Sequence, residues 1–401
     1  MAVRMRSANR RLMREMNESI VLGLIRRHEA ISRVEIARAA QLSAATVTGI
    51  TTSLIAHGLV REKATGVSTG GRRPILLSFN RKAGIAVGIK ITERQLVCVA
   101  TDLAGAEEKR NRVPLADGTQ PADVVALIAA EVARLREAYA PRRVFGVGVG
   151  IAGVVDRPSG VCRLSPFLHW QNVPLRAALE AVIPEPVVVE NDVNTLTFAF
   201  RSDVVPSSVS SFLAVTFGRG IGLGMILNGV PFRGARGQGG ELGHITVESD
   251  GSLCECGKRG CLEAVASMPA LIQEAARLVG KPLTEQEFRE LVLVRDSRVA
   301  GLTDRMANVF GEALAILVNI LNPDMVVLSG EGAWLIDHLY SPILQSMTAN
   351  VFDGLSADLE VRVEERPDEF WAMGAARVLL DEQFRPRLEH AQETEGLNHG
   401  R

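Results

Sequence analysis

Three cysteines and one histidine stand in this chain with the spacing of a metal site. Cys254, Cys256 and Cys261 fall within eight residues, and His244 precedes the first of them by ten. Thiolates and imidazole are the usual ligands of structural zinc, and four protein ligands leave no open position for chemistry. We therefore predict one structural Zn²⁺ on these four residues. The alternative is a set of buried thiols beside a core histidine, although such thiols have no reason to cluster between glycines.

Carboxylates flank this cluster. Glu241 lies three residues before His244, and Glu263 lies two residues after Cys261. Carboxylates beside a rigid metal site suit the recognition of sugar hydroxyls, which donate and accept hydrogen bonds. We expect Glu241, His244 and Glu263 to contact a sugar.

A second polar group follows an apolar strand predicted at 186–190. Asn191 and Asp192 would lie at the carboxyl end of that strand, where open α/β sheets bind ligands. We add both residues to the predicted sugar site, with an ordinary turn as the alternative. The glycine-rich stretch 218–224 is typical either of a phosphate-binding loop or of a tight hairpin. We expect the aromatic loop 165–170 to serve packing.

Composition sets the broad class. The chain has 401 residues, of which 47% are hydrophobic, enough for two or three globular domains. The sequence has no run of eighteen apolar residues that would indicate a membrane span, and its basic N-terminus is not followed by the apolar stretch of a signal peptide. We therefore expect a cytoplasmic protein. Cys98 and Cys162 are isolated, which favours a structural role in a reducing compartment.

The charge is divided unevenly along the chain. Residues 1–82 hold fifteen Lys and Arg against five Asp and Glu, a net +10, whereas the remainder holds thirty against forty-one, a net −11. A cationic segment on an acidic body is typical of DNA binding, because neutralising phosphates releases condensed counterions. A solvated basic tail is the alternative.

Helix signals in this basic segment favour DNA binding. Asn17 is a candidate cap for a first helix, Ser32 and Glu35 form a capping box for a second, and Ser43 can cap a third. Three short helices with a tight second turn, followed by two short strands, predict a winged helix-turn-helix. Its third helix would present small groups to a major groove, and the strand connection would place arginines on phosphates, with ordinary surface charge as their alternative. The predicted DNA contacts are Ser43, Ala44, Ala45, Thr46, Thr48, Arg72 and Arg73.

From residue 84 the pattern changes to alternating strands and helices, which repeats twice. Two such halves predict duplicated α/β lobes with a ligand cleft between them. The expected division is a DNA-binding domain with a basic arm at 1–82, a first lobe at 83–193 to which a helix at 372–385 returns, a second lobe with the zinc site at 194–371, and a polar tail at 386–401.

Taken in order, these motifs resemble the ROK family (repressors, open reading frames, kinases), and most closely its transcriptional-regulator branch. The shared features are the winged helix, Glu190-Asn191-Asp192 after a strand, the glycine-rich stretch, and the block from Glu241 to Glu263. The resemblance covers about residues 17 to 380. It implies the actin-like, hexokinase-like ATPase fold, sugar contacts and zinc ligands at the residues named above, and, in kinase members, a general base at the position of Asp192.

The resemblance also raises the question of catalysis. Kinase members carry an Asp-x-Gly-Gly-Thr loop that handles Mg²⁺ and phosphates, and we match it to the stretch from Gly88 to Thr92, which lacks the aspartate and both glycines. Arg219 replaces a threonine that is usual in kinases. The sequence thus predicts a sugar sensor without catalytic residues.

The favoured function is a sugar-responsive DNA-binding repressor of carbohydrate-use genes. It would bind operator DNA as a homodimer or higher homo-oligomer, and it would sense a monosaccharide or sugar phosphate in the cleft. The alternatives are an active ATP-dependent sugar kinase with an appended DNA-binding domain, and a regulator controlled by a protein partner.

Overall fold

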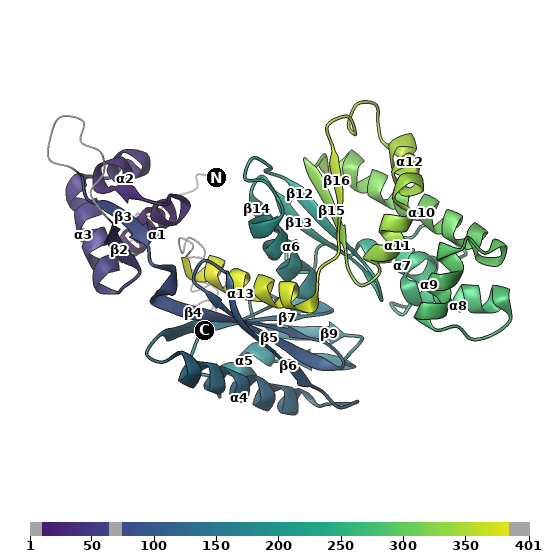
Figure 1. The fold of residues 1–401 in the computed structure, drawn as a ribbon, viewed down its shortest axis with the longest axis horizontal. Helices are drawn as coiled ribbons and strands as arrows, with labels where there is room; N and C mark the ends of the chain where they lie inside the picture. Colours follow the sequence, from purple (N-terminus) through teal and green to yellow (C-terminus); the bar gives the residue numbers. More distant parts are fainter. Residues whose placement is uncertain (1–9, 64–73, 385–401) are drawn as a thin grey trace, which may run out of the picture.

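The computed structural model describes residues 10–63 and 74–384, which form a small N-terminal head followed by two α/β lobes (Figure 1). This arrangement confirms the predicted mixed α/β class. The chain passes through the head, the first lobe and the second lobe in turn, and its last helix, α13 (Asp368–Phe384), returns to the first lobe. Arg72, Arg73, the N-terminal arm 1–9 and the expected tail 386–401 lie outside the described residues.

The head contains three helices, α1 (Arg10–Arg27), α2 (Arg33–Ala40) and α3 (Ala44–Ala56). Ser32 and Glu35 form the predicted capping box of α2, and the Ser43 hydroxyl accepts a hydrogen bond from the Thr46 amide at the start of α3. Asn17, however, does not cap α1, which already begins at Arg10. The residues before Asn17 are mostly strong helix formers, and they extend the helix by almost two turns.

A small antiparallel sheet completes the head, with the strand order β1-β3-β2. The predicted wing strands correspond to β2 and β3, and a short strand before α2 joins them. The bounds are β1 (Ile31–Ser32), β2 (Val60–Lys63) and β3 (Leu76–Phe79).

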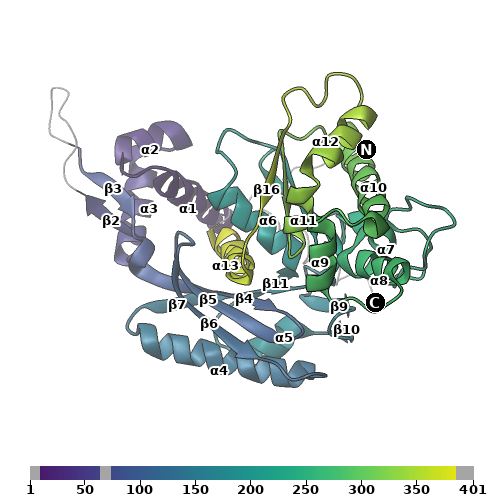
Figure 2. The same cartoon turned by 45° about the vertical axis from the view of Figure 1, so that its right-hand side comes forward.

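The first lobe is built on a five-stranded sheet with the order β11-β7-β4-β5-β6. Strands β4, β7 and β11 are parallel, and β5 is antiparallel to both of its neighbours. Helices α4 and α5 cover one face and α13 the other (Figures 1 and 2). A small sheet with the order β10-β9-β8 lies beside them. The bounds are β4 (Gly84–Ile91), β5 (Gln95–Asp102), β6 (Glu107–Pro114), α4 (Pro121–Tyr139), β7 (Arg143–Ile151), β8 (Val154–Asp156), β9 (Val161–Ser165), β10 (Trp170–Val173), α5 (Leu175–Glu180) and β11 (Val187–Asn191).

The second lobe repeats this topology. Its sheet has the order β14-β13-β12-β15-β16, in which β12, β15 and β16 are parallel. Helix α6 packs against β12 and β13, and the remaining helices of the lobe form a second apolar core around α10. The bounds are α6 (Asp192–Asp203), β12 (Phe212–Phe217), β13 (Ile221–Leu227), β14 (Val230–Phe232), α7 (Leu262–Ala266), α8 (Met268–Val279), α9 (Glu285–Leu293), α10 (Ser297–Leu321), β15 (Met325–Ser329), α11 (Ala333–His338), α12 (Tyr340–Asn350) and β16 (Glu360–Glu364).

Helices α6 and α13 pack on one another and form the layer between the two sheets. Backbone touches backbone in this layer. A Cβ atom on Gly88 of β4 would lie 1.9 Å from the Ala372 carbonyl oxygen, and one on Gly374 of α13 would lie 1.9 Å from the Thr195 carbonyl oxygen. Gly88 therefore faces α13 and cannot carry a side chain. None of the helices within 10–63 and 74–384 is long and apolar enough to cross a membrane.

The close contact at Gly88 yields a stability prediction. Gly88→Ala should lower the free energy of unfolding by about 1–3 kcal/mol or more, because neither the Ala372 carbonyl nor the sheet can move away cheaply. Gly301→Ala on α10 is the control, since no atom lies within 4 Å of its added Cβ and alanine favours a helix. Chemical denaturation of both variants makes the comparison. Equal stability of Gly88→Ala and the unmodified protein would contradict the packing described.

Candidate functional site

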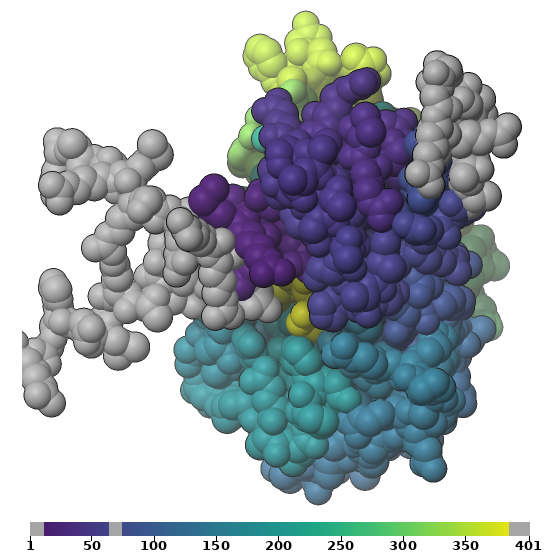
Figure 3. All heavy atoms as spheres, turned by 90° about the vertical axis from the view of Figure 1, so that its left-hand side faces the viewer, coloured from purple at the N-terminus to yellow at the C-terminus, as the bar shows by residue number. Residues whose placement is uncertain are grey.

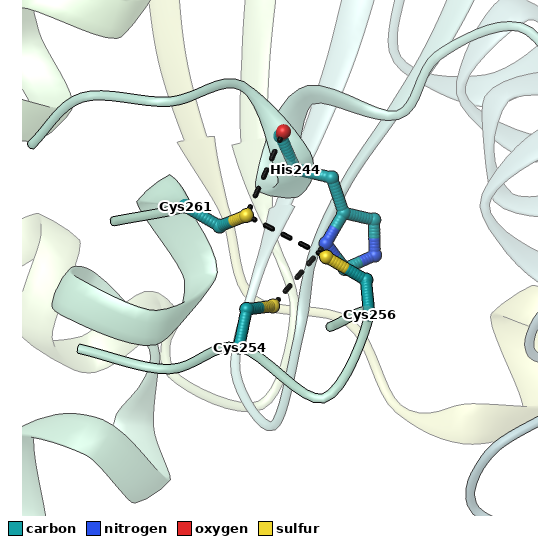
Figure 4. Close-up of side chains that lie close together, drawn as sticks. All are labelled: His244, Cys254, Cys256 and Cys261. Atoms are coloured by element: carbon teal, nitrogen blue, oxygen red, sulfur yellow. Dashed lines mark hydrogen bonds between the residues drawn. The ribbon is translucent and has the colours of Figure 1, made fainter. Parts of the chain in front are cut away.

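The predicted metal ligands converge on one point in the second lobe (Figure 4). One ligand atom from each of His244, Cys254, Cys256 and Cys261 lies within 4.8 Å of all the others. The sulfurs of Cys256 and Cys261 are 3.6 Å apart, as are the Cys254 sulfur and the Nδ1 atom of His244. Zinc–sulfur bonds of about 2.3 Å place two tetrahedral sulfurs about 3.8 Å apart. Two of the donor–donor distances are thus close to the tetrahedral value, and the donor set fits a tetrahedral metal ion such as zinc.

Short loops hold these ligands in place. His244 ends the 3-10 turn at Leu242–His244, and Cys261 immediately precedes α7. Between them the Cys254 amide donates to the Lys258 carbonyl at 2.8 Å, and the Lys258 ammonium donates to the His244 carbonyl at 2.5 Å. Gly257 has a φ of 87°, a conformation that glycine adopts at little cost. A metal ion would tie this loop to the start of α7.

The other ring nitrogen of His244 points to the predicted sugar-binding carboxylates. Its Nε2 atom lies 3.9 Å from an oxygen of Glu241, and Glu263 accepts a hydrogen bond of 3.0 Å from the Ile221 amide. Burial raises the pKa of the Glu241 carboxyl; His244 opposes this shift and Glu263 adds to it. A metal on Nδ1 would fix the ring orientation and direct Nε2–H away from the metal.

A small cavity of about 50 Å³ lies between the lobes, and both Asn191 and Glu241 line it. Asn191 also caps α6, since its side-chain oxygen accepts from the Asn194 amide and its side-chain nitrogen donates to the Gly153 carbonyl. The segment 237–240 of the second lobe closes the opposite wall. The fold thus brings Asn191 together with Glu241, and the turn at Leu242–His244 joins Glu241 to the metal cluster.

Asp192 lies in a different electrostatic setting from its neighbour Asn191. Burial raises the pKa of the Asp192 carboxyl; the Lys90 ammonium opposes this shift, and the Glu331 carboxylate adds to it. Lys90 itself is only 5% exposed, donates to Asp368 at 2.7 Å and lies 3.9 Å above the centre of the Trp371 ring. An internal cation thus stands at the carboxyl end of β4.

The structure also places the stretch that the sequence matched to the kinase phosphate loop. Gly88, matched to the missing aspartate, lies beneath α13, where an added Cβ atom would be 1.9 Å from the Ala372 carbonyl oxygen. Lys90, two residues further along β4, is the side chain on the same face that stands beside Asp192.

The glycine-rich stretch 218–224 forms the turn between β12 and β13 and the first part of β13. Arg219 at this turn pairs with Glu93 in the β4–β5 turn of the first lobe, and its guanidinium lies 4.2 Å from the centre of the Phe167 ring. The aromatic loop 165–170 therefore contributes to the contact between the lobes through Phe167, a role beyond packing within its own lobe.

Sequence reasoning missed the carboxylate with the most partners in this region. Glu190, next to last in β11, is 1% exposed. Its oxygens accept from Arg157 at 3.1 Å, from Arg233 at 2.7 Å and from the side chain of Asn194 at 3.0 Å. Glu190 stood in the same motif as Asn191, but its two arginine partners come from distant parts of the chain, so no local signal identified them.

Four of the predicted DNA-contacting residues lie in the first turns of α3, and a fifth, Ser43, caps this helix. Ser43, Ala44, Ala45 and Thr48 are exposed, and Thr46 is half-buried. The Thr48 hydroxyl donates to the Ala44 carbonyl at 2.8 Å, so its methyl group rather than its hydroxyl is free for contact.

Burial raises the pKa of the Cys98 thiol to about 12 and of the Cys162 thiol to about 11, which agrees with inert structural cysteines.

Comparison with known proteins gives the same family throughout. Residues 86–382 match the model of the ROK family. The chain is 31% identical over 390 residues to a putative xylose repressor of Caldicellulosiruptor sp., covering 93% of this chain and 98% of the relative. It is also 31% identical over 331 residues to the DNA-binding transcriptional dual regulator NagC of Escherichia coli K12 and to the N-acetylglucosamine repressor of E. coli O6:H1, with 80% of this chain and 81% of each relative covered.

Solved structures extend this likeness. A ROK family transcriptional regulator, a homologue of the E. coli MLC protein, superposes with a TM-score of 0.82 at 23% identity, covering 93% of this chain and 98% of that one. The ROK hexokinase of Thermus thermophilus superposes with a TM-score of 0.65 at 30% identity, covering 73% of this chain and 97% of that one. The family match and the nearly full-length relatives together show that this chain belongs to the ROK family, as one of its transcriptional regulators.

Proposed function

We propose that the protein is a sugar-responsive DNA-binding transcriptional regulator, a repressor of carbohydrate-use genes. One observation carries the proposal: the face of α3 with small exposed side chains belongs to a head that shares one apolar core with α13, β4 and β11 of the body. A body that holds an interlobe cavity is thus packed directly against a DNA-binding unit. The nearly full-length relatives named as repressors support this function.

The effector would be a monosaccharide or sugar phosphate bound by Asn191, Asp192, Glu241, His244 and Glu263. Asn191 and Glu241 line the interlobe cavity, and His244 stands beside Glu241, so the region offers oxygen acceptors and a ring N–H that suit the hydroxyl groups of a sugar. The relatives named for xylose and for N-acetylglucosamine indicate which ligands to try first. Thermal-shift screening of D-xylose, D-glucose, N-acetyl-D-glucosamine and their available phosphates would identify the class.

The metal ion would be one Zn²⁺ on His244, Cys254, Cys256 and Cys261, with a purely structural role. Bound zinc would supply a fixed positive centre that orients His244 and fastens the loop before α7.

Phosphoryl transfer is not part of the proposal. The Lys90 ammonium, paired with Asp368, supplies a fixed cation beside Asp192, whereas phosphoryl transfer relies on carboxylates that hold Mg²⁺. The proposed regulator binds operator DNA as a homodimer or higher homo-oligomer. The likeness to the Thermus thermophilus hexokinase keeps a sugar kinase as the second candidate, and an ATP-consumption assay over the same sugars distinguishes the two.

The zinc assignment predicts metal content. The purified protein should hold one zinc per chain, and Cys256→Ser should lose it, because hydroxyl oxygen is a poor substitute for thiolate. Cys98→Ala, at a buried thiol outside the cluster, should keep the metal. Elemental analysis of all three proteins makes the measurement; a metal-free preparation from chelator-free buffers would refute the assignment.

The DNA assignment predicts an effect on α3. Ala45→Glu should weaken operator affinity by about a hundredfold or more, because a carboxylate would face phosphates and base edges. Ala126→Glu makes the same change at an exposed position of α4 and should have no effect. Gel-shift titration at several salt concentrations provides the test, and equal affinities of the two variants would exclude α3 as the contact.

The sugar assignment predicts a selective loss of response. Asp192→Asn should weaken sugar affinity by about ten- to a hundredfold, the ~1.5–3 kcal/mol typical of a hydrogen bond to a charged group. Operator affinity without sugar should not change, and Asp304→Asn at an exposed carboxylate of α10 should leave both properties intact. Calorimetry and gel shift measure the two affinities. An unaltered sugar response in Asp192→Asn would point to another site or to a protein partner.

A further inference from the structure

The carboxylate of Glu190 joins two guanidinium groups that come from different parts of the molecule. Arg157 follows β8 in the first lobe, and Arg233 follows β14 in the second. Both donate through Nε to the same oxygen, at 3.1 and 2.7 Å. Because Glu190 is almost fully buried, neither guanidinium can leave without a large change in the electrostatic energy of the other two groups.

Arg233 is hydrogen-bonded to the wall of the interlobe cavity. Its carbonyl accepts from the Gly239 amide at 2.8 Å, and the segment it begins supplies the cavity residues 237–241. Gly237 of this segment lies against Arg157, since a Cβ atom there would be 3.1 Å from the Cβ of Arg157. A ligand that moves this segment must therefore disturb both arginines.

Arg157 continues the connection to the last turn of α13. Its second guanidinium nitrogen pairs with the carboxylate of Glu382. Arg157 is therefore held between the buried Glu190 carboxylate and a carboxylate on the C-terminal helix. The Arg157 and Glu190 side chains are 18% and 2% exposed, so water screens this pair little, whereas the Glu382 side chain is 43% exposed and its pair with Arg157 is partly screened.

The head rests on this same turn of α13. Phe384, the last residue of α13, meets the Phe79 ring of β3 edge to face with a centroid distance of 6.0 Å. The guanidinium of Arg26 in α1 lies 4.6 Å from the centre of the Phe384 ring and 5.5 Å from that of Phe79. In Figure 3 the yellow end of α13 shows between the purple head and the first lobe. Only Asn80 and the short turn Arg81–Ala83 separate β3 from β4, so a short connection keeps the head close to the body.

We infer that Arg233, Glu190, Arg157 and Glu382 form an ion-pair relay through which the occupied cavity shifts the last turn of α13 and, through Phe384, the position of the DNA-binding head. The inference rests on the proposed function and names its regulation. Ligand binding changes how closely the Glu190 carboxylate pairs with each of its two arginines. Arg157 then moves, and the Glu382 carboxylate moves with it or loses its contact. The head then changes its position relative to the lobes because Phe79 and Arg26 follow the Phe384 ring.

The test uses Glu382→Gln in the full chain, which keeps the shape of the side chain and removes the charge that Arg157 holds. Operator affinity is measured with and without each of D-xylose, D-glucose and N-acetyl-D-glucosamine, on a duplex selected from a random library with the unmodified protein. Allosteric coupling usually amounts to about 5- to 150-fold. We expect that sugar changes the operator affinity of Glu382→Gln by less than about threefold. The affinity of this variant for sugar should be nearly unchanged.

Glu180→Gln on α5 is the matched control, because it removes a carboxylate of similar exposure that pairs with Arg176 outside the relay. Phe384→Leu tests the other end and should also reduce the sugar effect, and the double variant with Glu382→Gln should lose no more than the stronger single variant. If the unmodified protein responds to sugar and Glu382→Gln responds equally, the relay is wrong while the proposed function holds. If no sugar changes the operator affinity of the unmodified protein, both fall.

Discussion

The packing of helix α13 on the first sheet is the contact on which the rest of this structure depends. It is a contact of backbone with backbone, made possible by Gly88 and Gly148 on the strands, while Gly374 on the helix allows an equally close approach of α6. At this distance the middle of the helix, around residues 372–376, cannot rotate or slide without large clashes, whereas the last turn lies beyond these contacts. One side of the helix meets the sheet and α6, and its last turn carries the head.

The charges of the cleft follow from this packing. Asp368 at the start of α13 holds the Lys90 ammonium at the carboxyl end of β4, and Lys90 in turn neighbours Asp192. An internal cation fixed by the protein thus stands beside Asp192. The metal cluster contributes on the other side, because a metal bound through Nδ1 leaves the Nε2 atom of His244 directed toward Glu241.

Local patterns in the sequence predicted the local features well. The capping box of α2, the cap of α3, helix α4 and the four clustered metal ligands all depend on residues close together in the chain. The missed features depend on distant residues. Glu190 gains its partners from Arg157 and Arg233, and Lys90 gains its partner from Asp368, which is 278 positions away.

The setting of the stretch matched to the phosphate loop has the same origin. A motif match along the sequence cannot show that α13 covers Gly88, nor that Lys90, two residues further on, neighbours Asp192. Asn17 illustrates a weaker kind of error, because capping residues also occur inside helices when strong helix formers precede them.

The central claim is that the interlobe cavity and the DNA-binding head form one mechanical unit. Hydrogen–deuterium exchange of the full chain, with and without a saturating sugar, tests it most directly. We predict altered exchange in the cavity segment 233–241 and, in the same experiment, in α13 and in α1 and β3 of the head. Altered exchange confined to the cavity, with the head and α13 unchanged, would contradict the account.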